Sequence, residues 1–175
     1  RQAKKMTSLI NQIMELSKLE RQNEVEKERI NFSNIILQLL EDYKPLLENS
    51  NIELIINIEK DLRIYGNKLM VERLFINLFI NAIKFTKTTI SVSLNRINKE
   101  IILQIKDDGV GIAKGEQKYI WDRFFQINNS RNKDKNRGSG LGLSMVNRIV
   151  QLHSATIEVE SEVGEGACFI VRFPI

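Results

Sequence analysis

The sequence holds too few cysteine and histidine residues for a covalent or metal-bound framework. Its 175 residues include one cysteine, Cys168, and one histidine, His153. A lone thiol cannot form an intramolecular disulfide, and with one imidazole it cannot complete a structural zinc site. A disulfide scaffold and a zinc module are therefore excluded, and we expect a reducing, cytoplasmic environment.

The sequence also lacks a long hydrophobic run and a strong excess of charge. No apolar stretch approaches the roughly 20 residues that cross a bilayer, and no signal-peptide pattern opens the chain. We expect no membrane contact within this segment, and anchoring of a longer parent protein stays open. Lys and Arg number 26 against 22 Asp and Glu, without a basic stripe, so we expect no nucleic-acid binding. Arg1 is already in helical phase, which predicts a segment upstream of it.

The composition that remains is typical of a packed globular domain. Apolar residues make up 42% and charged residues 27%, with two prolines. The mixture of hairpins and helices predicts an α+β fold, a two-layer α/β sandwich with a mixed sheet covered on one face by helices. We expect strands at 29–32, 52–58, 62–65, 88–96, 100–107, 156–161 and 167–173, and helices at 33–49, 67–86, 117–122 and from about 140, with Ser33 and Asn67 as N-caps.

An amphipathic helix precedes this domain. Apolar side chains recur at three- and four-residue steps from Met6 to Leu19, and the mostly charged or amide segment 20–29 follows. The change predicts a boundary near residue 28, with residues 1–27 as one unit and 28–175 as the other. Because the apolar face needs a partner, we expect this chain either to self-associate there or to fray.

Three polar side chains share one face of the helix expected at 67–86. Asn77, Asn81 and Lys84 stand at positions i, i+4 and i+7 among apolar residues. A solvated stripe is one explanation of this pattern. The other is a binding site, because carboxamide oxygens suit a hard cation such as Mg²⁺ and a lysine suits phosphate.

An acidic pair leads from the strand expected at 100–107 into a loop with glycines two apart. Asp107 and Asp108 precede Gly109 and Gly111. Such glycines permit a close approach of the backbone to a ligand, and a buried carboxylate accepts a hydrogen bond from an exocyclic amine. A plain Asp-Gly turn is the simpler explanation if the segment is taken alone.

A glycine-rich segment opens the last predicted helix. Between Arg137 and Leu143 stand Gly138, Gly140 and Gly142, which leave free amides at a helix start and so favour a polyphosphate. The spacing matches neither the P-loop nor the dinucleotide-binding pattern, and a flexible hinge is the competing explanation.

An aromatic segment, Trp121 to Phe125, comes just before a polar loop at 128–137. Aromatics at this spacing are more often core than ligand contacts. The loop is rich in cations that could close over phosphates as a lid: Arg131, Lys133, Lys135 and Arg137.

Taken in order, these segments resemble the catalytic, ATP-binding domain of bacterial sensor histidine kinases, in the superfamily shared with gyrase-type ATPases and a related heat-shock chaperone. Each motif is weak alone, whereas four in order are specific. The resemblance covers about residues 28–175, and Met6 to Glu20 looks like the second helix of a dimerisation and phosphotransfer hairpin. The matching motifs are the asparagine box at 77–85, the first glycine box at 107–111, the phenylalanine box at 121–125 and the second glycine box at 138–142.

The resemblance implies ATP and Mg²⁺ as cofactors and a role for each matching residue. Asn81 would bind the Mg²⁺ that bridges the triphosphate, and Asn77 and Lys84 would assist at the phosphates. Asp107 would accept a hydrogen bond from the adenine amine. The other nucleotide-binding positions that it implies are Phe85, Gly109, Gly111, Ile112, Phe125, Arg137, Gly138, Gly140, Leu141, Gly142 and Leu143.

The resemblance also implies an activity and its partners. The domain would transfer the γ-phosphoryl group of ATP to a histidine, which would pass it to an aspartate of a response regulator, within a homodimer formed through the helical hairpin. In the family that histidine lies on the first hairpin helix, whereas His153 follows a later helix and fits a core or helix-end role. We therefore expect no autophosphorylation by this chain alone. A superfamily ATPase, a serine-directed kinase and a non-enzymatic interaction module are the alternatives.

Overall fold

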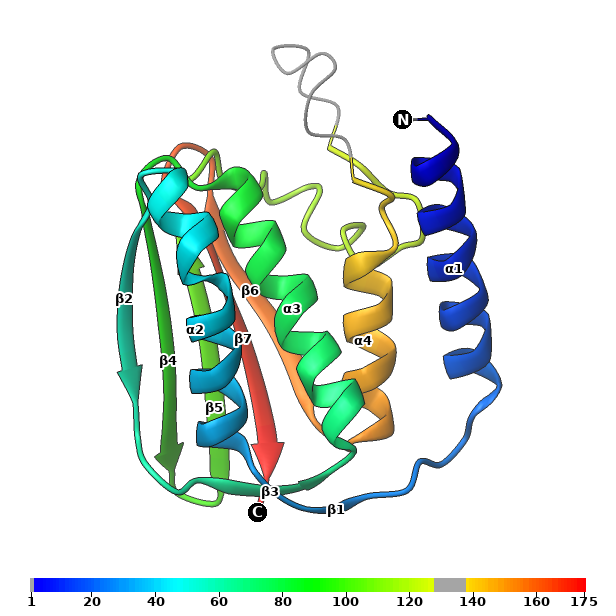
Figure 1. Cartoon of the computed structure of the whole chain (residues 1–175), viewed down its shortest axis with the longest axis vertical. Coiled ribbons are helices and arrows are strands. Elements are labelled where there is room, and N and C mark those ends of the chain that lie inside the picture. Colours follow the sequence, from blue (N-terminus) through cyan, green and yellow to red (C-terminus); the bar gives the residue numbers. More distant parts are fainter. Residues whose placement is uncertain (1, 128–137) are drawn as a thin grey trace.

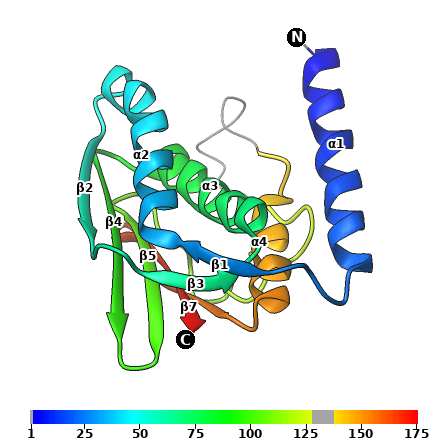
Figure 2. The same ribbon diagram turned by 60° about the horizontal axis from the view of Figure 1, so that its bottom comes forward.

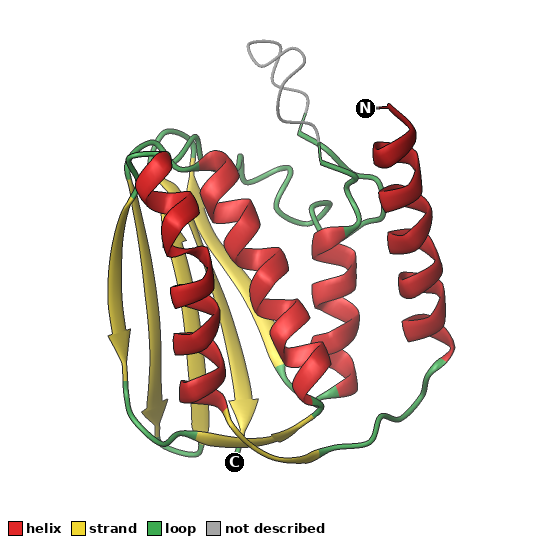
Figure 3. Cartoon of the chain, in the orientation of Figure 1, coloured by secondary structure: helices red, strands yellow, loops and turns green. Residues whose placement is uncertain are grey.

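The structure, a computed structural model, describes residues 2–127 and 138–175. A five-stranded mixed sheet forms one layer and helices form the other, as Figures 1 and 3 show. The predicted α+β sandwich with helices on one face of a mixed sheet is therefore confirmed. No helix within the described ranges is both long and apolar enough to cross a membrane.

The sheet is antiparallel except at one edge. Its order is β2-β4-β5-β7-β6, and only β2 runs parallel to its neighbour, β4. Alternate residues of β4 and β5 are buried under the helices, as a period of two requires. The strands are β2 (Glu53–Ile58), β4 (Thr89–Ile97), β5 (Glu100–Asp107), β6 (Thr156–Glu162) and β7 (Gly166–Pro174).

Helix α3 (Lys68–Phe85) is the centre of the helical layer, between α2 (Phe32–Asn49) and α4 (Gly142–Leu152) (Figure 1). Asn67 caps α3 as predicted, because its side-chain oxygen accepts a hydrogen bond from the amide of Met70 over 3.2 Å. One face of α3 fills the core with Val71, Leu74, Phe75, Leu78, Phe79 and Ala82, all buried. The opposite face carries Asn77, Asn81 and Lys84, which we call the asparagine stripe.

The predicted cap of α2 is wrong. Asn31 caps this helix by accepting from the amide of Asn34 over 3.0 Å. Ser33 lies inside the first turn and is buried, where its hydroxyl donates to the carbonyl of Glu59 (2.6 Å) and accepts from the amide of Leu62 (3.0 Å). Both residue types are good caps, and the tertiary contact decides between them.

The strands predicted near residues 29 and 63 are confirmed but lie outside the main sheet, and one predicted helix does not form. The strands near residues 29 and 63 form a separate two-stranded antiparallel sheet, β1 (Glu28–Asn31) with β3 (Arg63–Gly66), at one end of the sandwich (Figure 2). The helix expected at 117–122 is wrong, because the segment is a chain of turns. Its amides bond to carbonyls three residues back at Glu116, Tyr119 and Asp122, and no continuous helical ladder forms.

Helix α1 (Gln2–Arg21) lies beside α4 (Figure 1). The end of its apolar face is buried there, with Leu16 at 3% and Leu19 at 6% exposure, whereas Met6 near its start is 65% exposed. β1 begins at Glu28, and the division of the chain into two units at this point stays a prediction.

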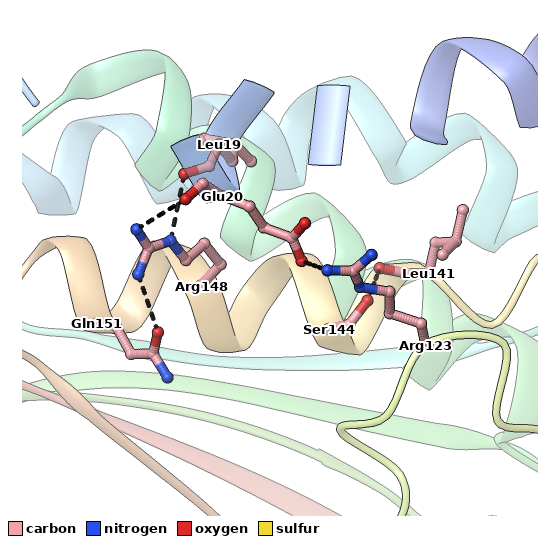
Figure 4. Close-up of polar contacts among 7 residues, drawn as sticks. All are labelled: Leu19, Glu20, Arg123, Leu141, Ser144, Arg148 and Gln151. Carbon is pink, nitrogen blue, oxygen red and sulfur yellow. Dashed lines mark hydrogen bonds and ion pairs between the residues drawn. The ribbon is translucent and has the colours of Figure 1, made fainter. Parts of the chain in front are cut away.

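Arginine side chains fasten the end of α1. Arg148 of α4 donates to the carbonyls of Leu19 (3.2 Å) and Glu20 (3.4 Å), and the Glu20 carboxylate pairs with Arg123 (Figure 4). Arg148 also donates to the carbonyl of Gln22. The carbonyls at a helix C-terminus have no partner within the helix, so Arg148 acts as their cap. A further ion pair joins Glu15 of α1 to Arg73 of α3.

Candidate nucleotide-binding site

The asparagine stripe of α3 faces the glycine-rich start of α4. A Cβ atom added at Gly142 would lie 3.0 Å from Oδ1 of Asn77. The carboxamide is held in place, since its nitrogen donates to the carbonyl of Arg73 over 2.9 Å and contacts the sulfur of Met145 at 3.8 Å. Two segments that the sequence singled out separately therefore form one surface.

Lys84 meets the same glycine segment from the last turn of α3. Its ammonium would lie 3.2 Å from a Cβ at Gly138, and it lies 4.8 Å from the ring centre of Phe85. Lys84 is half-buried, and this burial lowers its pKa. Asn81 is half-buried between Asn77 and Lys84 on this face.

Asp107 ends β5 as a buried carboxylate, 5% exposed, and its Oδ1 accepts from the amide of Gly109 over 2.8 Å. Burial raises the pKa of Asp107, against the opposing effect of hydrogen bonds from the amides of Gly109 and Ala167. A buried acceptor of this kind can hold an exocyclic amine. Phe85, at the end of α3, is 43% exposed, and its carbonyl lies close to Gly109.

The glycines after Asp107 are required first by the protein chain itself. A Cβ at Gly109 would collide with the carbonyl of Phe85, and one at Gly111, whose φ is +70°, with the carbonyl of Glu162. The sequence suggested that these glycines let a ligand approach the backbone closely. In the structure, the end of α3 and the β6–β7 turn also approach them closely. The amide of Ile112 donates to Oγ of Ser161 over 2.8 Å, which fastens the end of this loop to β6.

The aromatic segment is joined to the glycine segment. The amide of Phe124 donates to the carbonyl of Gly140 over 2.9 Å, and the Gln126 side chain donates to the carbonyl of Gly138 over 2.6 Å. Both Phe124 (φ +61°) and Gly140 (φ +72°) have left-handed backbones at this crossing. Phe125 is half-buried against Tyr119, with ring centres 5.9 Å apart.

The remaining predicted positions lie at the edge of this surface or beyond the described part. Leu141 is buried and Leu143 half-buried in the first turn of α4. Arg137 and the predicted lid at 128–137 lie outside the described residues.

Asp108 is the residue whose role sequence reasoning missed. Its carboxylate is the acceptor for Thr86, Lys87 and Thr88, which follow α3 directly. Burial opposes its charged form, yet the hydroxyls of Thr86 and Thr88 and the neighbouring amides hold the pKa of Asp108 well below its usual range. Hydroxyl residues beside the end of a helix were a usable signal, but the partner stands about twenty residues away in sequence.

The polar side chains of this face suit a metal ion that takes most of its ligands from a bound molecule and from water. In residues 2–127 and 138–175, no group of three or more His, Cys, Asp or Glu side chains gathers to hold a metal ion. A hard cation at this face would take a carboxamide oxygen from Asn81 and the rest of its ligands from phosphate oxygens and water, as Mg²⁺ commonly does.

The fold matches solved structures that include the catalytic domain of a histidine kinase. The catalytic domain of histidine kinase ThkA superposes with a TM-score of 0.75 at 23% identity, over 86% of this chain and 96% of that one. Full-length ShkA, solved in complex with AMPPNP, gives a TM-score of 0.84 at 23% identity, over 97% of this chain and 35% of that one. The fold is thus that of a histidine kinase catalytic domain.

Sequence comparison identifies the family. The family of histidine kinase-, DNA gyrase B- and HSP90-like ATPases matches residues 66–175, and this chain belongs to it. Sensor histidine kinase RppB of Synechocystis sp. is 31% identical over 179 aligned residues, which cover 100% of this chain and 39% of RppB. Sensor histidine kinase YclK of Bacillus subtilis is 29% identical, over 99% of this chain and 37% of YclK. The chain thus spans about two fifths of the length of these relatives.

Proposed function

We propose that this chain binds Mg²⁺-ATP and is the catalytic domain of a sensor histidine kinase. In this proposal the γ-phosphoryl group passes to a histidine outside the chain and then to an aspartate of a response regulator. The intact protein would act as a homodimer formed through a helical hairpin whose second helix is α1. The names of relatives such as RppB and YclK support this proposal.

The observation that carries the proposal is the approach of Asn77 and Lys84 to the glycine segment of α4. The amides of Gly140, Leu141 and Gly142 lie at a helix start, where the helix dipole favours phosphate oxygens. Asn81 would hold the Mg²⁺ that bridges the phosphates.

At the other end of the nucleotide, Asp107 would accept a hydrogen bond from the adenine amine, beside Phe85. Gly109, Gly111, Ile112 and Phe125 would shape the pocket. The domain would then contribute positioning and charge neutralisation, because phosphoryl transfer requires little covalent chemistry from the protein.

The acceptor is sought outside this chain because its one histidine is occupied. His153 is 4% exposed, and each ring nitrogen lies within hydrogen-bonding distance of a backbone group, at Asn67 and at Ile149. A buried imidazole with both nitrogens engaged is a poor nucleophile for a phosphoryl group.

The test is calorimetric titration of the chain with ATP, with and without Mg²⁺. We expect the Asn81→Asp variant to lose Mg²⁺-dependent ATP binding while its circular dichroism stays unchanged, because a carboxylate adds negative charge beside the triphosphate. The matched control is Asn57→Asp on the exposed strand β2. Unchanged affinity in Asn81→Asp would overturn the assignment.

An ATPase without a histidine acceptor is the second candidate, because the matching family includes ATPases of other kinds. The two are separated by adding a separately expressed hairpin from the same parent protein. A kinase labels the histidine of that hairpin, whereas an ATPase releases phosphate steadily whether or not the hairpin is present.

A further inference from the structure

Asp108 joins the segment that follows α3 to the end of β5, the two elements that carry the proposed nucleotide-binding residues. Its Oδ1 accepts from the hydroxyl of Thr86 (2.7 Å) and the amide of Lys87 (2.8 Å). Its Oδ2 accepts from the hydroxyl of Thr88 over 2.6 Å, and the amide of Thr88 is shared between both oxygens at 3.0 and 3.2 Å. One carboxylate thus collects the donors of three consecutive residues.

These contacts connect α3 to β5 where each element ends. Thr86 is the C-cap of α3, the helix that carries Asn81 and Lys84. Asp108 follows Asp107 directly, at the end of β5. The connection therefore fixes the end of α3, beside Phe85, against the end of β5, beside Asp107, by short hydrogen bonds, and so fixes the position of the helix that carries the phosphate-side residues.

The connection leaves little room for one segment to slide past the other. Gly109 lies so close to the carbonyl of Phe85 that no Cβ would fit between them. The amides of Lys87 and Thr88 can only donate, so they need an acceptor that no amide nitrogen could replace. A charged carboxylate meets this need with strong, short hydrogen bonds.

We propose that Asp108 is a positioning residue that fixes the spacing between the adenine-binding carboxylate of Asp107 and the Asn81–Lys84 face of α3. This inference rests on the proposed nucleotide site and adds to it a residue that touches neither adenine nor phosphate. Its role is to let one ATP molecule engage both ends at once.

A residue that sets the spacing between two subsites affects a ligand that binds to both subsites more than a ligand that binds to one. A ligand that engages two subsites gains from their correct separation, because the second contact forms at high effective concentration. Misplacement by about 1 Å removes much of this gain. A ligand that uses only one subsite, such as adenosine, gains nothing from the separation and so loses nothing when it changes.

The experiment compares Mg²⁺-ATP with adenosine as calorimetric ligands of the whole chain. In Asp108→Asn the side chain loses its charge and one acceptor oxygen, which weakens the hydrogen bonds from the 86–88 segment, so we expect the Kd of Mg²⁺-ATP to rise about tenfold or more. The Kd of adenosine should change less than about twofold. The matched control is Asp42→Asn on α2, where the exposed carboxylate accepts from the side chain of Gln38.

A second variant tests the same contact in case the Asp108→Asn protein does not fold. Thr88→Val removes the hydroxyl that donates to Oδ2 and keeps the backbone amide, so we expect the same preferential loss of Mg²⁺-ATP at smaller size. In the double variant the two losses should not add, because both remove one network.

The outcomes separate the two proposals. A parent chain that binds neither ligand contradicts the proposed function itself. A parent that binds both, with variants that weaken ATP and adenosine by the same factor, assigns Asp108 to general stability and overturns the spacing role. Unchanged ATP affinity in Thr88→Val and in folded Asp108→Asn also overturns it.

Discussion

The backbone amide of Asn67 donates a hydrogen bond to Nε2 of His153 over 3.0 Å. Nε2 is therefore unprotonated, and Nδ1 donates to the carbonyl of Ile149, 2.7 Å away. The contact joins the C-cap of α4 to the N-cap of α3, the two helices whose opposite ends form the candidate site. The sequence predicted a core or helix-end role for His153, and the structure gives it both.

The first prediction concerns the pH dependence of folding. Burial is the main effect on His153 and lowers its pKa, the charge of Lys27 lowers it further, and the Ile149 carbonyl opposes both. A depressed imidazole pKa gives stability that is complete above the unfolded value of about 6.5 and is lost as the pH falls through the folded value. We expect the His153 contribution to the free energy of unfolding to fall by up to about 1.4 kcal/mol per pH unit between the unfolded pKa and the lower folded pKa.

Urea denaturation between pH 7.5 and pH 5 measures this contribution. The raised pKa of Asp107 acts in the opposite direction, because a neutral buried carboxyl favours the folded state as the pH falls. His153→Gln serves as the reference, since its amide oxygen can accept from Asn67 without titrating. Equal slopes in the parent and this variant would contradict the prediction.

The second prediction separates stability from selectivity at Asp107. Because burial disfavours the charged form, Asp107→Asn should leave the melting temperature of the free protein equal or higher. Its preference for ATP over GTP should fall by tenfold or more, on the order expected when a buried hydrogen-bonding group loses its match. Competition titrations with both nucleotides give the ratio, and an unchanged ratio would remove Asp107 from adenine recognition.

The third prediction uses the contact between Gly142 and Asn77. Alanine at Gly142 is the better helix former by up to about 1 kcal/mol, but its Cβ would lie 3.0 Å from Oδ1 of Asn77. We expect Gly142→Ala to keep or raise the melting temperature and to weaken Mg²⁺-ATP binding several-fold. Gly115→Ala is the control, since nothing lies within 4 Å of its Cβ. Equal affinities in the two variants would show that the contact has no part in binding.

The fourth prediction concerns the attachment of α1. Arg148→Ala removes the cap of the last carbonyls of α1, and hydrogen bonds to a charged group contribute about 1.5–3 kcal/mol each. We expect amide hydrogen exchange within residues 2–21 to rise at least tenfold while α3 keeps its protection. Lys18→Ala, at an exposed position of the same helix, should leave exchange unchanged. Equal protection in Arg148→Ala would mean that Leu16 and Leu19 alone hold the helix.

Sequence periodicity predicted the parts of the fold that depend on local pattern. The alternation in β4 and β5 and the apolar face of α3 were readable because the burial of one face repeats at a fixed period. The cap of α2 was not, since Asn31 and Ser33 are both suitable and a distant carbonyl, that of Glu59, engages Ser33. Local preference is overruled where a tertiary hydrogen bond competes with it.

The candidate site, like the fold, could be predicted from the sequence only in part. Residue types and their order identified Asn77, Lys84 and the glycine segment, but their approach in space needed the packing of α3 against α4. Asp108 carried no periodic or motif signal of its own role, because its partners Thr86 and Thr88 lie about twenty residues away from it in sequence. Contacts between segments that are far apart in the sequence leave no periodic pattern from which they could be predicted.

The two outer strands of the sheet differ in the side chains that they present. Strand β6 places the carboxylates of Glu158 and Glu160 at the surface, whereas β2 exposes Ile55 and Ile56. Charged side chains on an edge strand discourage pairing with a foreign strand, and exposed isoleucines do not. Aggregation of partly opened molecules by strand addition would therefore begin at β2, and a lysine at position 55 is the change that would protect the chain in concentrated solution.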